Sequence, residues 1–223
     1  MSPAAAVTIT FLALFVVAAV AFSRWYFSEK QQVKRALRAA PRVDVGKLGE
    51  GQLARVTGEV EEHEGNVLRA PISGRPCVAF DVTVEEYRSS GKSGSWHTVI
   101  HEGEAVPFVV RDGTGRAIVR PSFVRVAIEV DDEKRSGFLN DASPELEAFL
   151  SRHGRSSAGW VFNKTLRYRE GVFEVGETVT VLGRARLEDD PSPDAAGHGY
   201  RDRPRRVVLE PPPDAPMLLS DDF

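Results

Sequence analysis

The sequence predicts a mainly β protein of the α+β class. We expect an N-terminal transmembrane helix, followed by an OB-like, twisted antiparallel sheet or open barrel with one short packed helix. Three observations lead to this expectation. Several short segments alternate apolar and polar residues, 19 glycines and 14 prolines fall at turn-like spacing, and one long uncharged run lies near the N-terminus.

Length and composition exclude several classes of protein. The 223 residues suffice for one or two domains. The formal net charge of −3, from 29 basic and 32 acidic residues, argues against a general polyanion binder, so we expect no nucleic-acid partner. A single cysteine, Cys77, excludes an intramolecular disulfide and a cysteine-rich zinc fold.

The uncharged run begins at Ala4 and ends at Phe22. As a helix, its 19 residues would span roughly 28 Å, close to the ~30 Å hydrocarbon core of a bilayer. Arg24 and the aromatic pair Trp25 and Tyr26 follow, as in interfacial anchors. We therefore expect residues 1–23 to anchor the chain in the lipid bilayer. A cleaved signal peptide is the alternative, but no basic residue precedes the run.

Basic residues follow the apolar run, and they set the expected orientation. The positive-inside rule predicts a single-pass protein of the bacterial inner membrane with its C-terminal domain in the cytoplasm, and a periplasmic domain is the alternative. Residues 24–42 contain good helix formers and predict a juxtamembrane helix, which ends before a glycine-containing linker at 43–51. Residues 51–221 are expected to form the β-rich domain.

Strands are predicted where apolar residues alternate or β-branched residues cluster. Segment 54–60 and segment 179–185 share an interior glycine two residues before a small apolar residue, as two strands of one coiled sheet or barrel would. A turn-rich corner at 71–76 leads into alternating residues at 77–87, and 89–95 is predicted to be a flexible loop. Further strands are predicted at 96–101, at 106–111 and 116–120 around the turn 112–115, at 124–130 and at 206–210.

The clearest helix is predicted at 143–154. Ser143 is a good N-cap, Pro144 fits the first helical position, and Gly154 suits the C-terminal end. Residues 166–185 read as strand, tight turn and strand. Residues 189–204 are expected to be a mobile loop, and 211–223 a proline-rich tail.

Six residues are candidates for a partner-binding or structural motif. They are Arg75, Asp112, Arg167, Tyr168, Arg169 and Glu170. The charged members of the 167–170 group could pair across strands or bind an anionic partner, and cross-strand pairing is the favoured interpretation.

No catalytic, metal or cofactor site is expected. His97 and His101 would project from one strand face about 13 Å apart, too far to share one zinc ion. Cys77 begins an alternating strand without a histidine partner nearby in sequence, which favours a buried structural thiol over a nucleophile.

Four separated motifs resemble a known family. They are PISGRPC (71–77), FVVRDGTGRAIVRP (108–121), ELEAFL (145–150) and LRYREGVFEVGETVTVLGRA (166–185). Together they resemble the GIDE domain of mitochondrial GIDE/MULAN-type ubiquitin ligases and their prokaryotic relatives, over residues 51–221. The resemblance implies the fold and a membrane setting. In the eukaryotic ligases the domain lies between the two mitochondrial membranes and contacts partner proteins, which conflicts with a cytoplasmic domain here.

The resemblance does not extend to ubiquitin transfer. A RING needs about eight Cys or His ligands for two zinc ions, and one cysteine cannot supply them. The sequence therefore predicts a prokaryotic-type member without the RING, a non-catalytic interaction or scaffold domain that binds a protein partner or itself near the bilayer. One alternative is an OB-like module for a small ligand, lipid headgroup or glycan, with Trp96, Trp160 and Tyr168 as candidate exposed aromatics. The other is an E3-related component, as the family label suggests.

Overall fold

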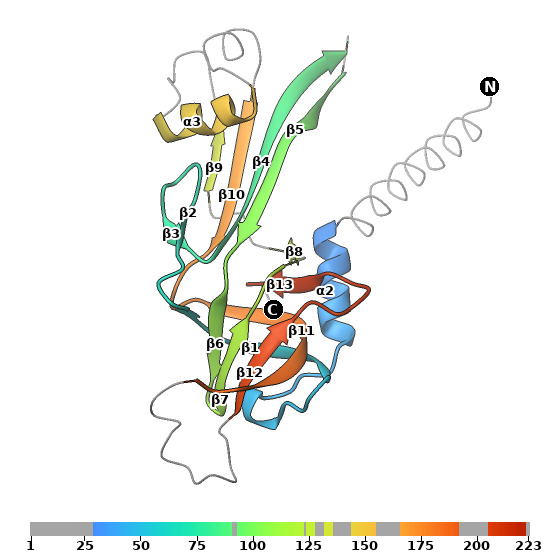
Figure 1. The fold of residues 1–223 in the computed structure, drawn as a ribbon. Coiled ribbons are helices and arrows are strands. Elements are labelled where there is room, and N and C mark those ends of the chain that lie inside the picture. The colour runs from blue at the N-terminus through green and yellow to red at the C-terminus, as the bar shows by residue number, and fades with distance from the viewer. Residues whose placement is uncertain are drawn as a thin grey trace, which may run out of the picture.

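The structure is a computed structural model that describes residues 29–90, 93–122, 124–127, 132–135, 144–154, 166–191 and 205–221. A β-barrel and a four-stranded sheet lie end to end, with helices on their outer faces (Figure 1). The helices are α2 (Glu29–Ala39), the 3-10 turn η1 (Val45–Lys47) and α3 (Pro144–Arg152). The strands are β1 (Leu53–Glu62), β2 (Leu68–Arg69), β3 (Pro76–Cys77), β4 (Ala79–Ser90), β5 (Ser93–Ala105), β6 (Phe108–Asp112), β7 (Gly115–Val119), β8 (Val124–Ala127), β9 (Asp132–Arg135), β10 (Leu166–Phe173), β11 (Thr178–Asp189), β12 (Arg205–Glu210) and β13 (Met217–Ser220).

Five strands form a closed barrel in the order β1-β6-β7-β12-β11, which the pairing of β1 with β11 completes. The mainly β class is therefore confirmed, but the expected open barrel is closed. The expectation of purely antiparallel pairing is also wrong, because β12 pairs with β7, and β13 with β8, in parallel. Apolar side chains such as Val56, Phe108 and Leu209 fill the barrel interior.

Glycines allow the barrel to close. At Gly58, a Cβ atom would overlap the backbone of Arg111, so only glycine permits β1 to pass from β11 to β6 at this point. At Gly183, a Cβ would lie 3.1 Å from the carbonyl oxygen of Glu210. The two segments with similar glycines, 54–60 and 179–185, pair directly with each other, with Ala54 opposite Gly183.

The second sheet has the order β5-β4-β10-β9. The chain leaves the barrel at Glu62 and returns at Phe108, its direct partner in the β1–β6 ladder. The predicted strand, turn and strand at 166–185 are present locally, with Gly176 at a positive φ of 93° in the turn. Their strands do not pair with each other, because β10 belongs to the four-stranded sheet and β11 to the barrel.

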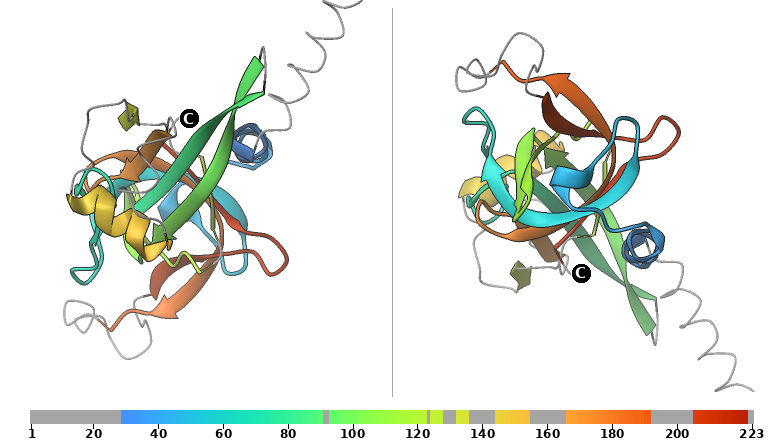
Figure 2. Two further views of the ribbon diagram at one scale, coloured as in Figure 1. Left: turned by 90° about the horizontal axis from the view of Figure 1, so that it is seen from above. Right: turned by 90° about the horizontal axis from the view of Figure 1, so that it is seen from below.

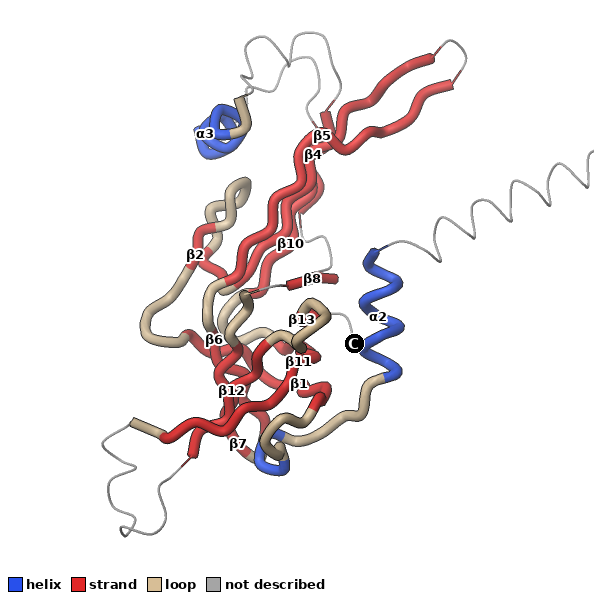
Figure 3. The backbone as a smooth tube through the Cα atoms, turned by 45° about the vertical axis from the view of Figure 1, so that its right-hand side comes forward, coloured by secondary structure: helices blue, strands red, loops and turns tan. Residues whose placement is uncertain are grey.

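Helix α3 covers one face of this sheet, as its apolar spacing predicted. Leu146, Phe149 and Leu150 are buried against a cluster that includes Val82 and Leu166. Figure 3 shows α3 on one side of β4, β5 and β10, with the opposite side of the sheet turned toward α2. The sheet therefore has one apolar face under α3 and one more polar face.

The β4–β5 hairpin corrects the prediction of a flexible loop at 89–95. Strand β4 continues to Ser90 and β5 begins at Ser93, so only residues 91–92 lie between them. Trp96 pairs with Tyr87, and a Cβ at Gly94 would collide with the Tyr87 ring. Aromatic packing over a strand glycine offsets the low strand preference of the glycine- and serine-rich segment.

The predicted tail at 211–223 also contains structure. Strand β13 inserts beside β11, with Met217 and Leu219 fully buried. Helix α2 packs on the outside of the barrel against β8, β11 and β13, through Val33 and Leu37, and is seen end-on in Figure 2. The proline-rich composition led to the prediction of a tail, whereas the segment MLLS (217–220) forms a strand that pairs with both β11 and β8.

Several expectations fall on residues outside the described ranges. They include the apolar run at 4–22, the first part of the juxtamembrane segment to residue 28, and residues 192–204 of the predicted loop. Among the described residues, no helix has the length and apolar content that a membrane crossing requires.

Candidate interaction surface

Strand β10 sends its four candidate residues to opposite faces of the sheet. Tyr168 and Glu170 are buried on the α3 side, at 2% and 0% exposure. Arg167 and Arg169 lie opposite Glu85 and Thr83 on the other face. The structure therefore separates these residues into two inward-facing structural positions and two outward-facing ones.

Glu170 holds the turn-rich corner at 71–76 against β10. Its two carboxylate oxygens accept hydrogen bonds from the amides of Ile72 and Ser73, at 2.7 and 2.9 Å. Arg75 reaches the same region and pairs with Glu174 at 2.7 Å. Glu170 and Arg75 thus hold the corner against the sheet. This structural role accounts for both residues, and no bound ligand is needed to explain them.

Asp112 organises the β6–β7 turn and the linker. One of its oxygens accepts hydrogen bonds from the Thr114 amide and hydroxyl and from the Gly115 amide, and the other accepts one from Val45 in η1. Burial alone would raise the pKa of Asp112, but these hydrogen bonds together lower it below its ordinary value. Asp112 is therefore a structural carboxylate.

The outward face of the sheet carries an aromatic and cationic cluster. The rings of Tyr87 and Trp96 meet edge-on with their centroids 5.4 Å apart. The Arg167 guanidinium lies 4.4 Å from the Trp96 ring centroid and donates from Nε to Glu85 at 2.7 Å. Cross-strand pairing of Arg167 is thus observed, and Arg169 lies 3.6 Å from the same carboxylate. We call Tyr87, Trp96 and Arg167 the aromatic cluster.

Sequence reasoning found only part of this cluster. Trp96 was a candidate exposed aromatic and is partly exposed, whereas Tyr168 is buried and Trp160 lies outside the described residues. Tyr87, 41% exposed, was missed. The alternation that continues from Asp81 through Thr83 and Glu85 would have placed it on the polar face, but its pairing with Trp96 depends on the tight hairpin.

A cleft of about 770 Å³ continues from this face to the barrel. Its floor includes Asp81, Arg169 and Gly171, and β8 forms a wall. His101 lies in the cleft with its Nε2 2.6 Å from an Asp81 oxygen. The lining mixes acidic, basic and apolar groups. Such a mixed lining is better suited to binding a polypeptide than to binding a small ion of a single charge.

The two histidines of β5 do not share a face, contrary to the prediction. A register shift between Val84 and Glu85 leaves Val99 as an extra residue, so His97 lies opposite Glu86 and His101 opposite Thr83. No group of three or more potential metal ligands converges within the described ranges. Cys77 is buried, and burial, with Glu170 and Glu174 nearby, raises the pKa of its thiol to about 11, so it is a poor nucleophile.

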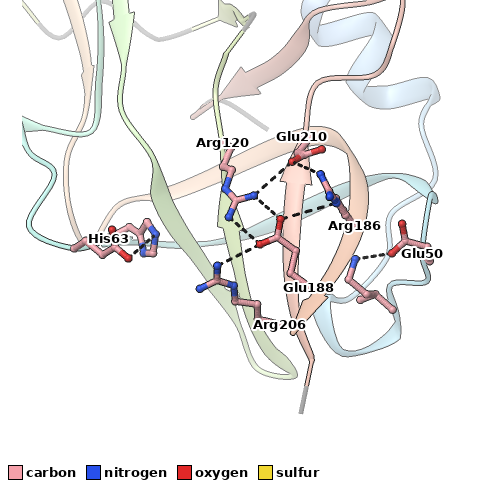
Figure 4. A network of polar contacts seen from close by, with 9 residues as sticks. Glu50, His63, Arg120, Arg186, Glu188, Arg206 and Glu210 are labelled. Carbon is pink, nitrogen blue, oxygen red and sulfur yellow. Dashed lines mark hydrogen bonds and ion pairs between the residues drawn. The ribbon is translucent and has the colours of Figure 1, made fainter. Parts of the chain in front are cut away.

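The barrel carries a separate network of ion pairs, drawn in Figure 4. Glu188 accepts two short hydrogen bonds from Arg120, at 2.6 and 2.9 Å, and one from Arg206 at 3.2 Å. Glu210 lies 3.5 Å from both Arg120 and Arg186. Three arginines share two glutamates in this network, and the pairs link β11 and β12 to the end of β7. A groove of about 570 Å³ lies nearby, lined in part by His63, Ile118 and Arg206.

Comparison with known proteins identifies a family. The model of the GIDE family, described as E3 Ubiquitin ligase, matches residues 81–196. The matched region begins in β4 and includes both the aromatic cluster and the cleft. No curated protein and no solved structure matches the chain.

Proposed function

The chain belongs to the GIDE family, and from this membership we propose that it is a membrane-anchored, non-catalytic interaction domain that binds a protein partner near the bilayer. The aromatic cluster is the observation that carries the proposal. Trp, Tyr and Arg are the residues that most often dominate binding energy at protein interfaces. Here all three lie together on the one face of the sheet that α3 does not cover.

The strand order of the barrel supports a binding module over an enzyme. A five-stranded barrel with one parallel pair is the topology of OB-type folds, which bind through surfaces and loops. The single cysteine among the 223 residues cannot provide the ligands of a RING, so we infer that these residues do not transfer ubiquitin. An in vitro ubiquitination assay on this chain is expected to be negative, and product formation would contradict the inference.

The membrane anchor and its orientation are part of the proposal. Residues 4–22 are long and apolar enough to span a bilayer, and the basic residues after them favour a cytoplasmic domain in the bacterial inner membrane. The N-terminal end of α2 and the tip of the β4–β5 hairpin point to the same side of the molecule (Figure 1). An anchor that continues from α2 would therefore place the hairpin and its aromatic cluster on the side nearer the bilayer.

Affinity capture from detergent extracts of the native membrane tests partner binding. We expect Trp96→Ala and Tyr87→Ala each to reduce recovery of a specific partner by about tenfold, the effect of losing one hot-spot side chain. Val175→Ala is the matched control, because Val175 is 51% exposed in the turn after β10, outside the cluster. Equal recovery with all three variants, or recovery of a lone monomer by the wild type, would contradict the proposal.

A small-ligand function is the second candidate. The groove beside β6, β7 and β12 combines apolar residues with Arg116, Arg206 and His63, which is the kind of lining that a lipid headgroup or glycan needs. Thermal-shift screening with headgroup analogues and oligosaccharides tests this alternative. A shift that Ile118→Ala abolishes, with Trp96→Ala as control, would favour it over protein binding.

A further inference from the structure

Strand β5 is the edge of the four-stranded sheet. It pairs with β4 along nearly its whole length of 13 residues, and the sheet order places no described strand on its other side. Exposed sheet edges present backbone donors and acceptors to other chains, and proteins usually protect them with prolines, lysines or very short strands. Residues 93–105 contain neither proline nor lysine.

The ladder fixes which backbone groups face outward. Val106 donates its amide hydrogen to the carbonyl of Val78, and a Cβ atom at Gly103 would lie 3.4 Å from the carbonyl oxygen of Phe80, so the carbonyls of Val78 and Phe80 both face β5. Antiparallel pairs alternate between bonded and non-bonded types. Glu104 and Glu102 therefore bond to β4, whereas the amide and carbonyl of Gly103 and Ala105 point away from it.

The cleft lies next to this edge. Its lining includes Gly103, Glu104 and Ala105 in succession, so it borders the backbone edge as well as one face of β5. Asp81 of β4 and Gly171 of β10 also line it, so the cleft opens over the sheet face beside an added strand. Side chains of an added strand that point to this face can enter the cleft, because successive side chains of a strand alternate between the two faces.

A β-bulge at Val99 divides the edge of β5 and limits how far another strand can pair with it. The extra residue at Val99 interrupts the regular pairing pattern, so a new strand cannot bond continuously along all of β5. The segment beyond the bulge, from residue 101 to 105, is regular and borders the cleft. The Trp96 ring lies on the other side of the bulge and can receive a side chain of a longer segment.

We propose that residues 101–105 of β5 bind an extended segment of a partner protein, which adds to the four-stranded sheet as a fifth strand beside the cleft. This deepens the proposed function and rests on it, because it specifies the conformation of the partner at the same surface. Main-chain hydrogen bonds supply affinity in this mode of recognition, and the flanking side chains supply selectivity.

A second copy of this chain is a poor occupant for the edge. Pairing of β5 with its own copy in antiparallel fashion would place the two hairpins in opposite directions. The N-terminal ends of α2 point with the hairpin tips (Figure 1), so the N-terminal ends of α2 in the two copies would also point in opposite directions. With the proposed anchor ahead of α2, two copies in one bilayer cannot pair in this way.

Peptide selection on the full-length chain tests the proposal. The probe is a displayed library of random peptides about ten residues long, selected on the detergent-solubilised wild type. Ala105→Pro removes the outward amide, and Ala105→Ser is the matched control that keeps it. We expect Ala105→Pro to weaken the selected peptides by at least about tenfold, and Ala105→Ser to leave them nearly unchanged.

Hydrogen exchange on the wild type tests peptide binding to this edge without relying on the folding of the Ala105→Pro variant. Peptide binding should slow exchange of the Gly103 and Ala105 amides by about tenfold or more. Undiminished binding to a folded Ala105→Pro chain, protection confined to other strands, or a selection without binders would each overturn the proposal. A wild-type dimer that Ala105→Pro converts to monomer would assign the edge to a second copy and also overturn it.

The two proposals fail in different ways. If Trp96→Ala abolishes partner capture while Ala105→Pro retains it, the protein-binding function stands and strand addition is wrong. If the wild type captures no partner and selects no peptide, both are wrong.

Discussion

Glu170 illustrates how one buried carboxylate can be wholly structural. It lies at 0% exposure, yet both oxygens accept backbone amides from the corner at 71–76. A buried charge is tolerable only when hydrogen bonds compensate it. Its position in the alternating pattern of β10 was predictable, but the partners are about a hundred residues away in sequence, and no local rule identifies them.

Glu170→Gln tests this role. The side-chain amide would turn a donor toward the Ile72 or Ser73 amide, so we expect the free energy of unfolding to fall by about 2–3 kcal/mol. Chemical denaturation measures the change. Glu174→Gln is the control, because its pair with Arg75 is about one-third exposed and should cost less than about 1 kcal/mol. Equal losses in the two variants would contradict the assignment.

Glu188 makes stability depend on pH in the acid range. Hydrogen bonds from Arg120, with Arg206 contributing, lower the pKa of Glu188 from 4.5 to about 2. A depressed pKa in the folded state stabilises the fold above the unfolded value. That contribution is present at neutral pH and is lost as the pH falls from about 4.5 toward 2.

Glu188→Gln should therefore lower the free energy of unfolding by about 1–2 kcal/mol at pH 7. Its deficit relative to the wild type should shrink as the pH falls below 4.5. Denaturation curves at a series of pH values measure this. Glu62→Gln, at an exposed position of β1, should show no such trend. A deficit that stays constant down to pH 2 would contradict the role of Glu188.

At the scale of elements, segments with strong local signals were predicted well. Helix α3 follows from a capping residue, a proline at the first turn and an apolar stripe, and the β6–β7 hairpin follows from its DGTG turn. The strands at 77–87 and 96–101 were predicted, but their continuation through residues 88–95 and strand β13 were missed, because these segments have weak local strand preference and form through pairing and aromatic packing. The aromatic cluster depends on the β4–β5 hairpin, so only Trp96 and Arg167 were identified beforehand.

Phe149→Ala tests the packing of α3 on the sheet. Phe149 is 1% exposed, and removal of its ring should cost about 3–4 kcal/mol of unfolding free energy. Ser151→Ala, on the exposed side of the same helix, should change stability by less than about 0.5 kcal/mol. Near-equal stability of Phe149→Ala and wild type would mean that α3 does not pack on the sheet as described.

At the scale of the whole molecule, the sequence predicted the fold class, but it did not predict which strands belong to the barrel and which to the four-stranded sheet. Alternation distinguishes buried from exposed faces, but it does not reveal which of several strands will pair. The chain order interleaves barrel and sheet, and β10 and β11 are neighbours in sequence that belong to different sheets. Closure of the barrel depends on contacts between β1 and β11, more than a hundred residues apart.

Membrane orientation is the prediction that belongs to this scale. The basic residues at 24–42 predict that a reporter fused after Phe223 stays in the cytoplasm. Alkaline phosphatase fused there should be inactive, and a fluorescent protein that folds only in the cytoplasm should be bright. Active phosphatase would assign the domain to the periplasm.

The junction between the sheet and the barrel has a calorimetric consequence. Val78, Ala79 and Phe173 belong to strands or connections of the four-stranded sheet, yet they are buried within the apolar cluster of the barrel. Melting of the sheet would pull these side chains out of the barrel interior and expose its remaining core to water. The two sheets should therefore absorb heat in a single transition, with calorimetric and van't Hoff enthalpies that agree.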